Sequence, residues 1–136
     1  MKKLLLCASL CFLFLQACNT DHCETPFGEG GILDITQPDV SALCNVGGAV
    51  MINRGHKGIM VTRISYNDFV AFECTCPNDT DVRLQADAVF GSSVLTCPTC
   101  GSRFSSLDGT PFDGAATPCP LYEYNTIFDG QYLTIY

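Results

Sequence analysis

Hydrophobic residues are distributed along this chain in two different ways. An almost unbroken apolar run covers residues 4–15, directly after Lys2 and Lys3. Farther along, apolar residues form short runs. In residues 58–65 one set of side chains, Ile59, Val61, Arg63 and Ser65, alternates with Met60, Thr62 and Ile64, which fits a β-strand and not a helix. Such runs occupy residues 48–52, 58–65, 69–73, 93–96 and 132–136. No convincing helical stripe follows the first run, so the pattern predicts an all-β protein.

Turn residues separate the short runs. Residues 53–58 have the glycines and polar side chains of a hairpin loop, and Asp108-Gly109 and Asp129-Gly130 are strong turn dipeptides. A length of 136 residues allows one domain and makes two domains unfavourable. The sequence therefore predicts one small antiparallel β domain over residues 32–136.

The first apolar run has the features of an export signal over residues 1–17. It is shorter than the roughly 20 helical residues that cross a bilayer, and it follows a positively charged start. It ends in Leu15-Gln16-Ala17-Cys18, which resembles the lipobox of bacterial lipoproteins. The resemblance implies that Cys18 is lipidated and anchors the protein to a membrane of the bacterial cell envelope. The alternative is plain cleavage nearby, which would leave Cys18 as a free or disulfide-bonded thiol.

Residues 18–31 are polar, with Pro26 and several glycines, and predict a lipidated tether between the anchor and the domain. The whole chain has 14 acidic and 7 basic side chains and a net charge of −7. This balance argues against a nucleic-acid partner, which would require a basic surface.

The cysteines are the candidate functional residues of the chain. Beyond residue 18 seven of the 10 cysteines remain: Cys23, Cys44, Cys74, Cys76, Cys97, Cys100 and Cys119. An exported protein is in an oxidising compartment, so disulfides and metal binding both have to be considered. An odd number leaves at least one cysteine unpaired or bound to a metal. Cys44 is expected in the core, and Cys119 in a proline-rich loop with a possible disulfide partner.

Two short segments carry the specific motifs. The first is Ala71-Phe72-Glu73-Cys74-Thr75-Cys76-Pro77-Asn78, and the second is Thr96-Cys97-Pro98-Thr99-Cys100-Gly101-Ser102-Arg103-Phe104. Together with the proline loop at residues 114–118, they resemble the cluster-binding loops of the Rieske iron–sulfur family. The resemblance covers residues 47–136 and implies a small Rieske-like β domain, with two metal-type loops on a β-sandwich base.

The chain departs from this family at the ligands. A Rieske centre holds one iron by two cysteines and the other by two histidines. One alignment places Cys76 and Asn78 on the first Cys-x-His pair, and another places Cys74 and Cys76 there. In both, Cys100 stands at the second histidine position. The only histidines, His22 and His56, lie outside the two motifs, so an ordinary Rieske cluster is excluded.

Four thiols are nevertheless expected to converge, namely Cys74, Cys76, Cys97 and Cys100. Side chains two residues apart in a strand share a face, and Cys-x-x-Cys suits tetrahedral thiolate coordination. The set is suited to a [2Fe–2S]-type cluster of low potential or to zinc, and disulfides or free thiols without metal are an equal alternative. A thioredoxin-type site is disfavoured, because Cys97 and Cys100 precede a turn and a strand instead of a helix.

The function expected from these features is electron transfer by a metal centre, with no enzymatic activity and with an unknown redox partner. The competing hypothesis is a structural or partner-binding lipoprotein, in which the cysteines bind zinc or form disulfides. Of the two hypotheses, the electron-transfer lipoprotein is the favoured one.

Overall fold

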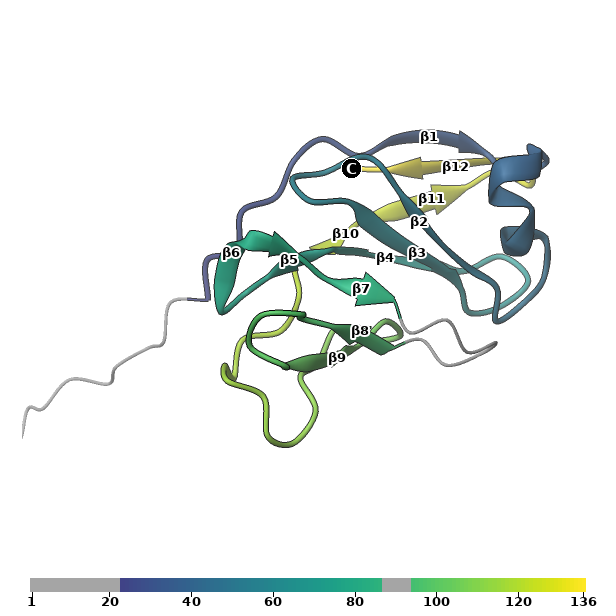
Figure 1. The fold of residues 1–136 in the computed structure, drawn as a ribbon. Helices are drawn as coiled ribbons and strands as arrows, with labels where there is room; N and C mark the ends of the chain where they lie inside the picture. Colours follow the sequence, from purple (N-terminus) through teal and green to yellow (C-terminus); the bar gives the residue numbers. More distant parts are fainter. Residues whose placement is uncertain (1–22, 87–93) are drawn as a thin grey trace, which may run out of the picture.

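The computed structural model describes residues 23–86 and 94–136, which form short antiparallel strands and one 3-10 helix (Figure 1). The elements are β1 (Gly31–Asp34), η1 (Pro38–Cys44), β2 (Ala49–Ile52), β3 (Ile59–Arg63), β4 (Phe69–Glu73), β5 (Thr75–Cys76), β6 (Asp79–Arg83), β7 (Gln85–Ala86), β8 (Val94–Thr96), β9 (Arg103–Ser105), β10 (Glu123–Tyr124), β11 (Thr126–Phe128) and β12 (Tyr132–Ile135). Every strand predicted from the hydrophobic pattern is present.

The strands form layers. A three-stranded sheet of order β1-β12-β11 covers one side of a four-stranded sheet of order β10-β4-β3-β2. The three-stranded sheet β7-β8-β9 lies on the other side of the four-stranded sheet, and the β5-β6 pair lies at the end of β4 (Figure 1). All pairings are antiparallel. The prediction of a small all-β domain with a sandwich base is confirmed.

The four-stranded sheet is buried on both faces, because each face contributes to a separate core. In β3, Ile59 and Val61 belong to the core shared with β12 and the helix, whereas Met60 belongs to the core that contains the cysteines. In β4, Ala71 and Phe72 divide between the two cores in the same way. Alternating side chains point to opposite faces of a strand, so one strand pair supports both the sandwich and the thiol loops.

The predicted hairpin loop at residues 53–58 joins β2 to β3, with Ile52 paired to Ile59. Gly55 has φ of +71°, and a Cβ at this position would lie 2.4 Å from Glu73 Oε2. Glycine is therefore required there both for the left-handed backbone and for the close approach to the carboxylate. The loop lies against the end of β4, which is where the cysteine segment begins.

The helix η1 packs Val40 and Leu43 into the sandwich core.

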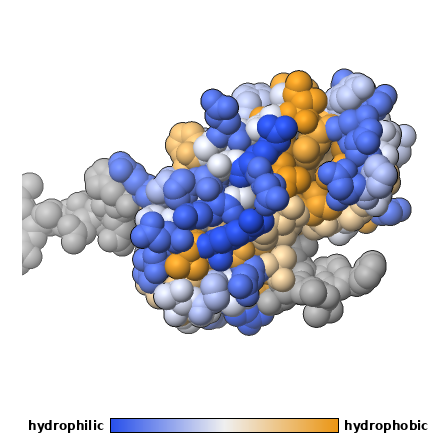
Figure 2. All heavy atoms as spheres, turned by 45° about the horizontal axis from the view of Figure 1, so that its top comes forward, coloured by the Kyte–Doolittle hydropathy of each residue, from blue (hydrophilic) through white to orange (hydrophobic). Residues whose placement is uncertain are grey.

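Within residues 23–86 and 94–136, no helix has the length and apolar character needed to span a bilayer. The signal peptide expected over residues 1–17 and the lipidation expected at Cys18 lie outside the described residues. Hydrophobic and hydrophilic areas alternate across the face that is drawn in Figure 2.

The N-terminal segment differs from the expected tether. Cys23 forms a disulfide with Cys119, and the ring of Phe27 stacks on Tyr122 with 4.1 Å between centroids. The Gly28 N–H donates to Tyr124 Oη (3.1 Å), and Glu29 O accepts from the backbone of the hairpin loop. The chain is thus attached to the domain from Cys23 onward, eight residues before β1 starts at Gly31. Polar composition predicted a tether because it does not reveal a disulfide.

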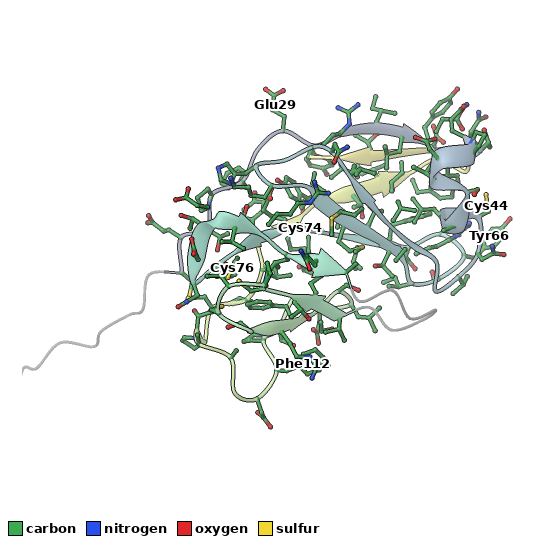
Figure 3. All side chains as sticks on the ribbon, in the orientation of Figure 1. Glu29, Cys44, Tyr66, Cys74, Cys76 and Phe112 are labelled. Atoms are coloured by element: carbon green, nitrogen blue, oxygen red, sulfur yellow. A yellow bond between two sulfur atoms is a disulfide. The ribbon has the colours of Figure 1, made fainter. Side chains whose placement is uncertain are left out.

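Two expectations about unassigned cysteines have different outcomes. The disulfide partner expected for Cys119 exists and is Cys23. The expected core position of Cys44 is wrong, because this free cysteine is exposed at the end of η1, where its thiol donates to Ile35 O (3.3 Å). It lies at the helix end of the molecule, away from Cys74 and Cys76 (Figure 3).

Candidate metal centre

Three of the four predicted thiols come together between two loops. The Sγ atoms of Cys76, Cys97 and Cys100 all lie within 4.8 Å of one another, and those of Cys76 and Cys100 are 3.7 Å apart. Cys76 and Cys97 are fully buried, and Cys100 is partly exposed at the surface. The two loops therefore hold an enclosed group of sulfur atoms with one accessible member.

The Cys97–Cys100 segment is a tight turn between β8 and β9. The Gly101 N–H donates to Cys97 O (2.9 Å), and the Cys97 N–H donates to Ser102 O (2.8 Å). Gly101 has φ of +72°, a conformation that glycine adopts without strain. The Cys100 N–H points at Cys97 Sγ (3.5 Å). This turn brings both sulfur atoms to the same side, as the Cys-x-x-Cys spacing predicted.

The segment with Cys74 and Cys76 is held from both sides. The Cys74 N–H donates to Gly58 O (2.8 Å) in the hairpin loop, and Cys74 O accepts from the Leu84 N–H (2.7 Å). The pairing of β5 with β6 shifts its register between Thr75 and Cys76. A shift of this kind re-aims a side chain relative to a regular strand.

Cys74 lies outside the group of three. Its side chain is fully buried in the same core cluster as Cys76 and Cys97, against which Cys100 packs, but its sulfur is not part of the close group and lies 3.9 Å from Phe72 O. The expected convergence of four thiols therefore holds for three at close range, with the fourth in the same buried cluster. Because the register shifts after Thr75, the side chains of Cys74 and Cys76 do not share a face as they would in a regular strand.

The thiols have different acidities. Burial raises the pKa of Cys76 to about 12, and a hydrogen bond with Cys97 acts in the same direction. Burial and the charge of Glu73 raise the pKa of Cys74 to about 12. For Cys100, burial opposes ionisation, but hydrogen bonds from the Ser102 hydroxyl and backbone, Cys97 and Cys76 outweigh it and lower the pKa to about 7. Cys100 thus ionises more readily than Cys74 and Cys76, and thiolates are the form that binds metals.

Ser102 was not identified by sequence reasoning, although it stands only two residues after Cys100. Its Oγ lies 3.1 Å from Cys100 Sγ and accepts the Ala116 N–H (2.8 Å) from the proline loop. The Ala116 bond occupies a lone pair, so the hydroxyl hydrogen remains available for a thiolate. Ser102 is buried and links the proline loop to the sulfur group.

Glu73 precedes the cysteine segment and is a fully buried carboxylate. It accepts hydrogen bonds from the N–H groups of His56 and Lys57 (both 2.8 Å), from Thr75 Oγ1 (2.9 Å) and from Tyr124 Oη (2.7 Å). Four donors compensate the cost of burying the charge. Through them, Glu73 connects the hairpin loop, β5 and β10 at the base of the thiol loops.

Histidine is absent from the described sulfur group, in agreement with the sequence analysis. His56 lies near the first motif, with its Nδ1 3.1 Å from Thr75 Oγ1. His22 lies outside the described residues.

The donor set fits a thiophilic metal. Thiolates select zinc, copper(I) and iron–sulfur clusters over the hard cations magnesium and calcium. With Zn–S bonds of about 2.3 Å, two sulfurs of a tetrahedron lie ~3.8 Å apart, close to the separation of the Cys76 and Cys100 sulfurs. Cys76, Cys97 and Cys100 would hold such a centre, with Cys74 in the same cluster as a fourth thiol.

No protein-family model matches the chain, and no curated protein matches it. The solved structures that are similar to it include the following two. The ferredoxin of carbazole 1,9a-dioxygenase from Nocardioides aromaticivorans IC177 is 19% identical with a TM-score of 0.48, and the match covers 82% of this chain and 97% of that one. A complex of reduced oxygenase and oxidized ferredoxin in carbazole 1,9a-dioxygenase gives 20% identity and a TM-score of 0.47, covering 79% and 90%. At this identity and TM-score, the similarity assigns no function.

Proposed function

We propose that this protein is a metal-binding, electron-transfer module of the bacterial cell envelope. Its centre is a [2Fe–2S]-type cluster with thiolate ligands on the two loops, and it is anchored to a membrane by lipidated Cys18. The observation that carries the metal centre is the convergence of three sulfur atoms from two loops within 4.8 Å. The protein is a carrier and not an enzyme, so a redox protein partner is required.

The motifs favour an iron–sulfur centre of the Rieske type in which cysteine replaces histidine. Thiolate ligands in place of neutral imidazoles add negative charge, which disfavours reduction of the cluster. We therefore expect a reduction potential near that of plant-type ferredoxins, about −400 mV, and not above about −150 mV as in Rieske centres. Protein-film voltammetry of the purified protein measures this value. A potential above about −150 mV would contradict thiolate ligation of both iron atoms.

A single metal ion such as zinc is the second candidate, and a specific observation favours it. The three closely spaced sulfur atoms suit one tetrahedral ion, whereas Cys74 lies outside their group. A two-iron cluster with four thiolates needs Cys74 as a ligand, but a single ion held by three cysteines does not. Cys74 thus distinguishes the two centres.

The experiment compares metal and sulfide content in the full chain and in Cys97→Ser, Cys74→Ser and Cys44→Ser variants. Visible absorption with iron and acid-labile sulfide in the parent, lost in Cys97→Ser and Cys74→Ser, supports the cluster. A colourless protein with one zinc that persists in Cys74→Ser supports the single ion. Cys44→Ser is the matched control, because Cys44 is a free cysteine far from the site. A parent without metal, purified anaerobically, would refute both centres.

A further inference from the structure

A second polar site lies on the hairpin loop between β2 and β3. A pocket of about 340 Å³ is lined by Asn53, Arg54, Gly55, His56, Lys57, Gly58 and Arg83. Three of these residues carry a positive charge, and His56 adds an imidazole ring. The pocket therefore gathers three of the five Lys and Arg residues in residues 23–86 and 94–136.

The charged ends of these residues have few partners. Lys57 makes no described side-chain contact, and Arg54 uses only Nη1, which donates to Gly30 O (3.2 Å). Arg83 donates through Nη1 to Asn53 Oδ1 and through Nε to the thioether sulfur of Met51, both at 3.2 Å. A thioether is a weak acceptor. Among residues 23–86 and 94–136, strong acceptors are therefore missing for most of the guanidinium and ammonium donors of this pocket.

The remaining two cations of the described chain are used differently. Arg63 donates to four backbone carbonyl groups, and Arg103 lies over the ring of Phe112 at 5.5 Å. The positive charges of Arg63 and Arg103 therefore interact with backbone carbonyl groups or an aromatic ring of the domain. The three pocket cations have fewer such partners.

The acidic composition of the protein makes this arrangement unusual. The chain has twice as many acidic as basic residues, 14 against 7, yet no ion pair joins Arg54, Lys57 or Arg83 to a carboxylate of the described residues. The nearby carboxylate of Glu73 is satisfied by four other donors on the inner side of the loop. Unpaired positive charges in a concavity concentrate the field and attract anions.

The loop conformation keeps the pocket in shape. Gly58 has φ of +117°, and a Cβ there would lie 3.1 Å from Arg83 Nη2, so the guanidinium rests directly on the loop backbone. Gly55 lets the same loop close over Glu73. Arg54, Lys57 and Arg83 are thus presented by a loop with fixed geometry and a neighbouring strand.

We propose that this pocket binds a small-molecule oxyanion, through a phosphate or carboxylate group contacted by Arg54, Lys57 and Arg83. Guanidinium groups bind both kinds of oxyanion with paired hydrogen bonds, and a lysine adds a point charge. The site requires no metal and lies outside the sulfur group, so it does not depend on the function proposed above.

Titration calorimetry of the full chain with inorganic phosphate, and separately with malonate, tests the site at low ionic strength. We expect saturable binding of one anion per chain, weakened about tenfold or more in Lys57→Gln and Arg83→Gln, as loss of one charge-assisted contact implies. Phosphate-only binding would assign the phosphate group, and binding of malonate would assign carboxylates. Lys57→Gln is the cleaner variant, because the side chain makes no contact on which folding depends.

Arg103→Gln is the matched control, since it removes the same charge from a site away from the pocket. Binding that is unchanged in Arg103→Gln but weakened in the pocket variants supports the proposal. Three results would overturn it: no saturable heat with either anion, an equal effect of Arg103→Gln, or affinity unchanged by Lys57→Gln and Arg83→Gln together. Sodium chloride at matched ionic strength corrects for general screening.

Discussion

At the scale of single residues, the acidity of a candidate metal-binding thiol depends on a side chain that is not itself a candidate ligand. Ser102 accepts a hydrogen bond from the Ala116 N–H and contacts the sulfur of Cys100, the thiol whose pKa is lowered to about 7. Its effect depends on a hydroxyl donor, because a donor favours the thiolate over the thiol. Ser102 therefore prepares one thiol for metal binding or reaction.

Replacing Ser102 with alanine is expected to raise the pKa of Cys100 from about 7 towards its ordinary value of 9.0. At pH 7 the thiolate fraction falls, and alkylation of Cys100 in the reduced, metal-free protein becomes slower. The pH dependence of alkylation, followed by mass spectrometry of Cys100, measures this change. Ser102→Thr keeps the hydroxyl and should restore the profile. An unchanged profile in Ser102→Ala would show that Ser102 has no such effect.

Tyr124 and Glu73 form a second residue-scale unit. Burial, together with the hydrogen bond and charge of Glu73, raises the pKa of Tyr124 above its ordinary value of 10.0. The native protein then keeps the phenol proton at a pH where the unfolded chain loses it. The contribution of this pair to stability is complete below pH 10 and is lost as pH rises through the native pKa.

Tyr124→Phe is expected to lower the free energy of unfolding at neutral pH by about 2 kcal/mol, because a buried hydrogen bond to a charged acceptor is removed. Above pH 10 the parent should lose stability faster than the variant, so the difference between them shrinks. Urea unfolding between pH 7 and pH 11 measures both effects. Cys74 and Cys76 titrate in both proteins and cancel in the comparison. A constant difference over this range would contradict the assignment.

Among residues, the sequence located the cysteine motifs but not the individual contacts. Cys97 and Cys100 were placed together correctly, because a tight turn over four residues leaves little freedom. The relation of Cys74 to Cys76 was not predictable, since it depends on a register shift against β6. The exposure of Cys44 was also missed, because cysteine is usually buried and only the position of η1 decides otherwise.

At the scale of elements, the Cys23–Cys119 disulfide joins the N-terminal segment to the proline loop. The two cysteines are 96 residues apart in the chain. The same loop reaches Ser102 through Ala116, so the disulfide fastens an element that borders the sulfur group. The bond connects the start of the described chain with the wall of the candidate metal centre.

Removing this disulfide with Cys23→Ser is expected to lower the free energy of unfolding by about 4 kcal/mol, because a long loop of the unfolded chain is released. Chemical unfolding of the oxidised proteins measures the loss. Cys119→Ser should give the same result, and Cys44→Ser should leave stability unchanged. A Cys23→Ser variant as stable as its parent would show that packing alone holds the segment.

Elements differ in how well the hydrophobic pattern reveals them. The strands β2, β3, β4, β8 and β12 were predicted, because their side chains alternate between core and surface or fill two cores. The strands β1, β6 and β11 were missed, since they carry exposed residues such as Ile32 and Ile127 and therefore lack a clear hydrophobic pattern. Their pairing depends on neighbouring strands and not on their own composition.

At the scale of the whole molecule, the domain is joined to the expected anchor by a short connection. Only residues 19–22 separate Cys18 from the disulfide-bonded Cys23. At about 3.6 Å per extended residue, the five steps from Cys18 to Cys23 span at most ~18 Å. If Cys18 carries the lipid, the domain is held near the membrane surface.

Cys18→Ser is expected to release the protein from the membrane fraction, because the attachment site of the lipid is lost. Fractionation of cells producing the full chain measures the shift, and mass spectrometry of the parent should detect an acylated N-terminal Cys18. Cys23→Ser serves as the control, since it should remain in the membrane fraction. A parent with an unmodified Cys18 in the soluble fraction would refute the anchor.

The sequence by itself determined the all-β class, the main strands, the hairpin loop and the two cysteine motifs, because these follow from local periodicity, turn residues and short spacings. Only the tertiary structure decided which thiols meet, where Cys23 finds its partner, and that Arg83 joins the hairpin loop. Each of these joins residues that are distant in the chain or depends on strand register. Packing between sheets sets such contacts, and no local pattern encodes them.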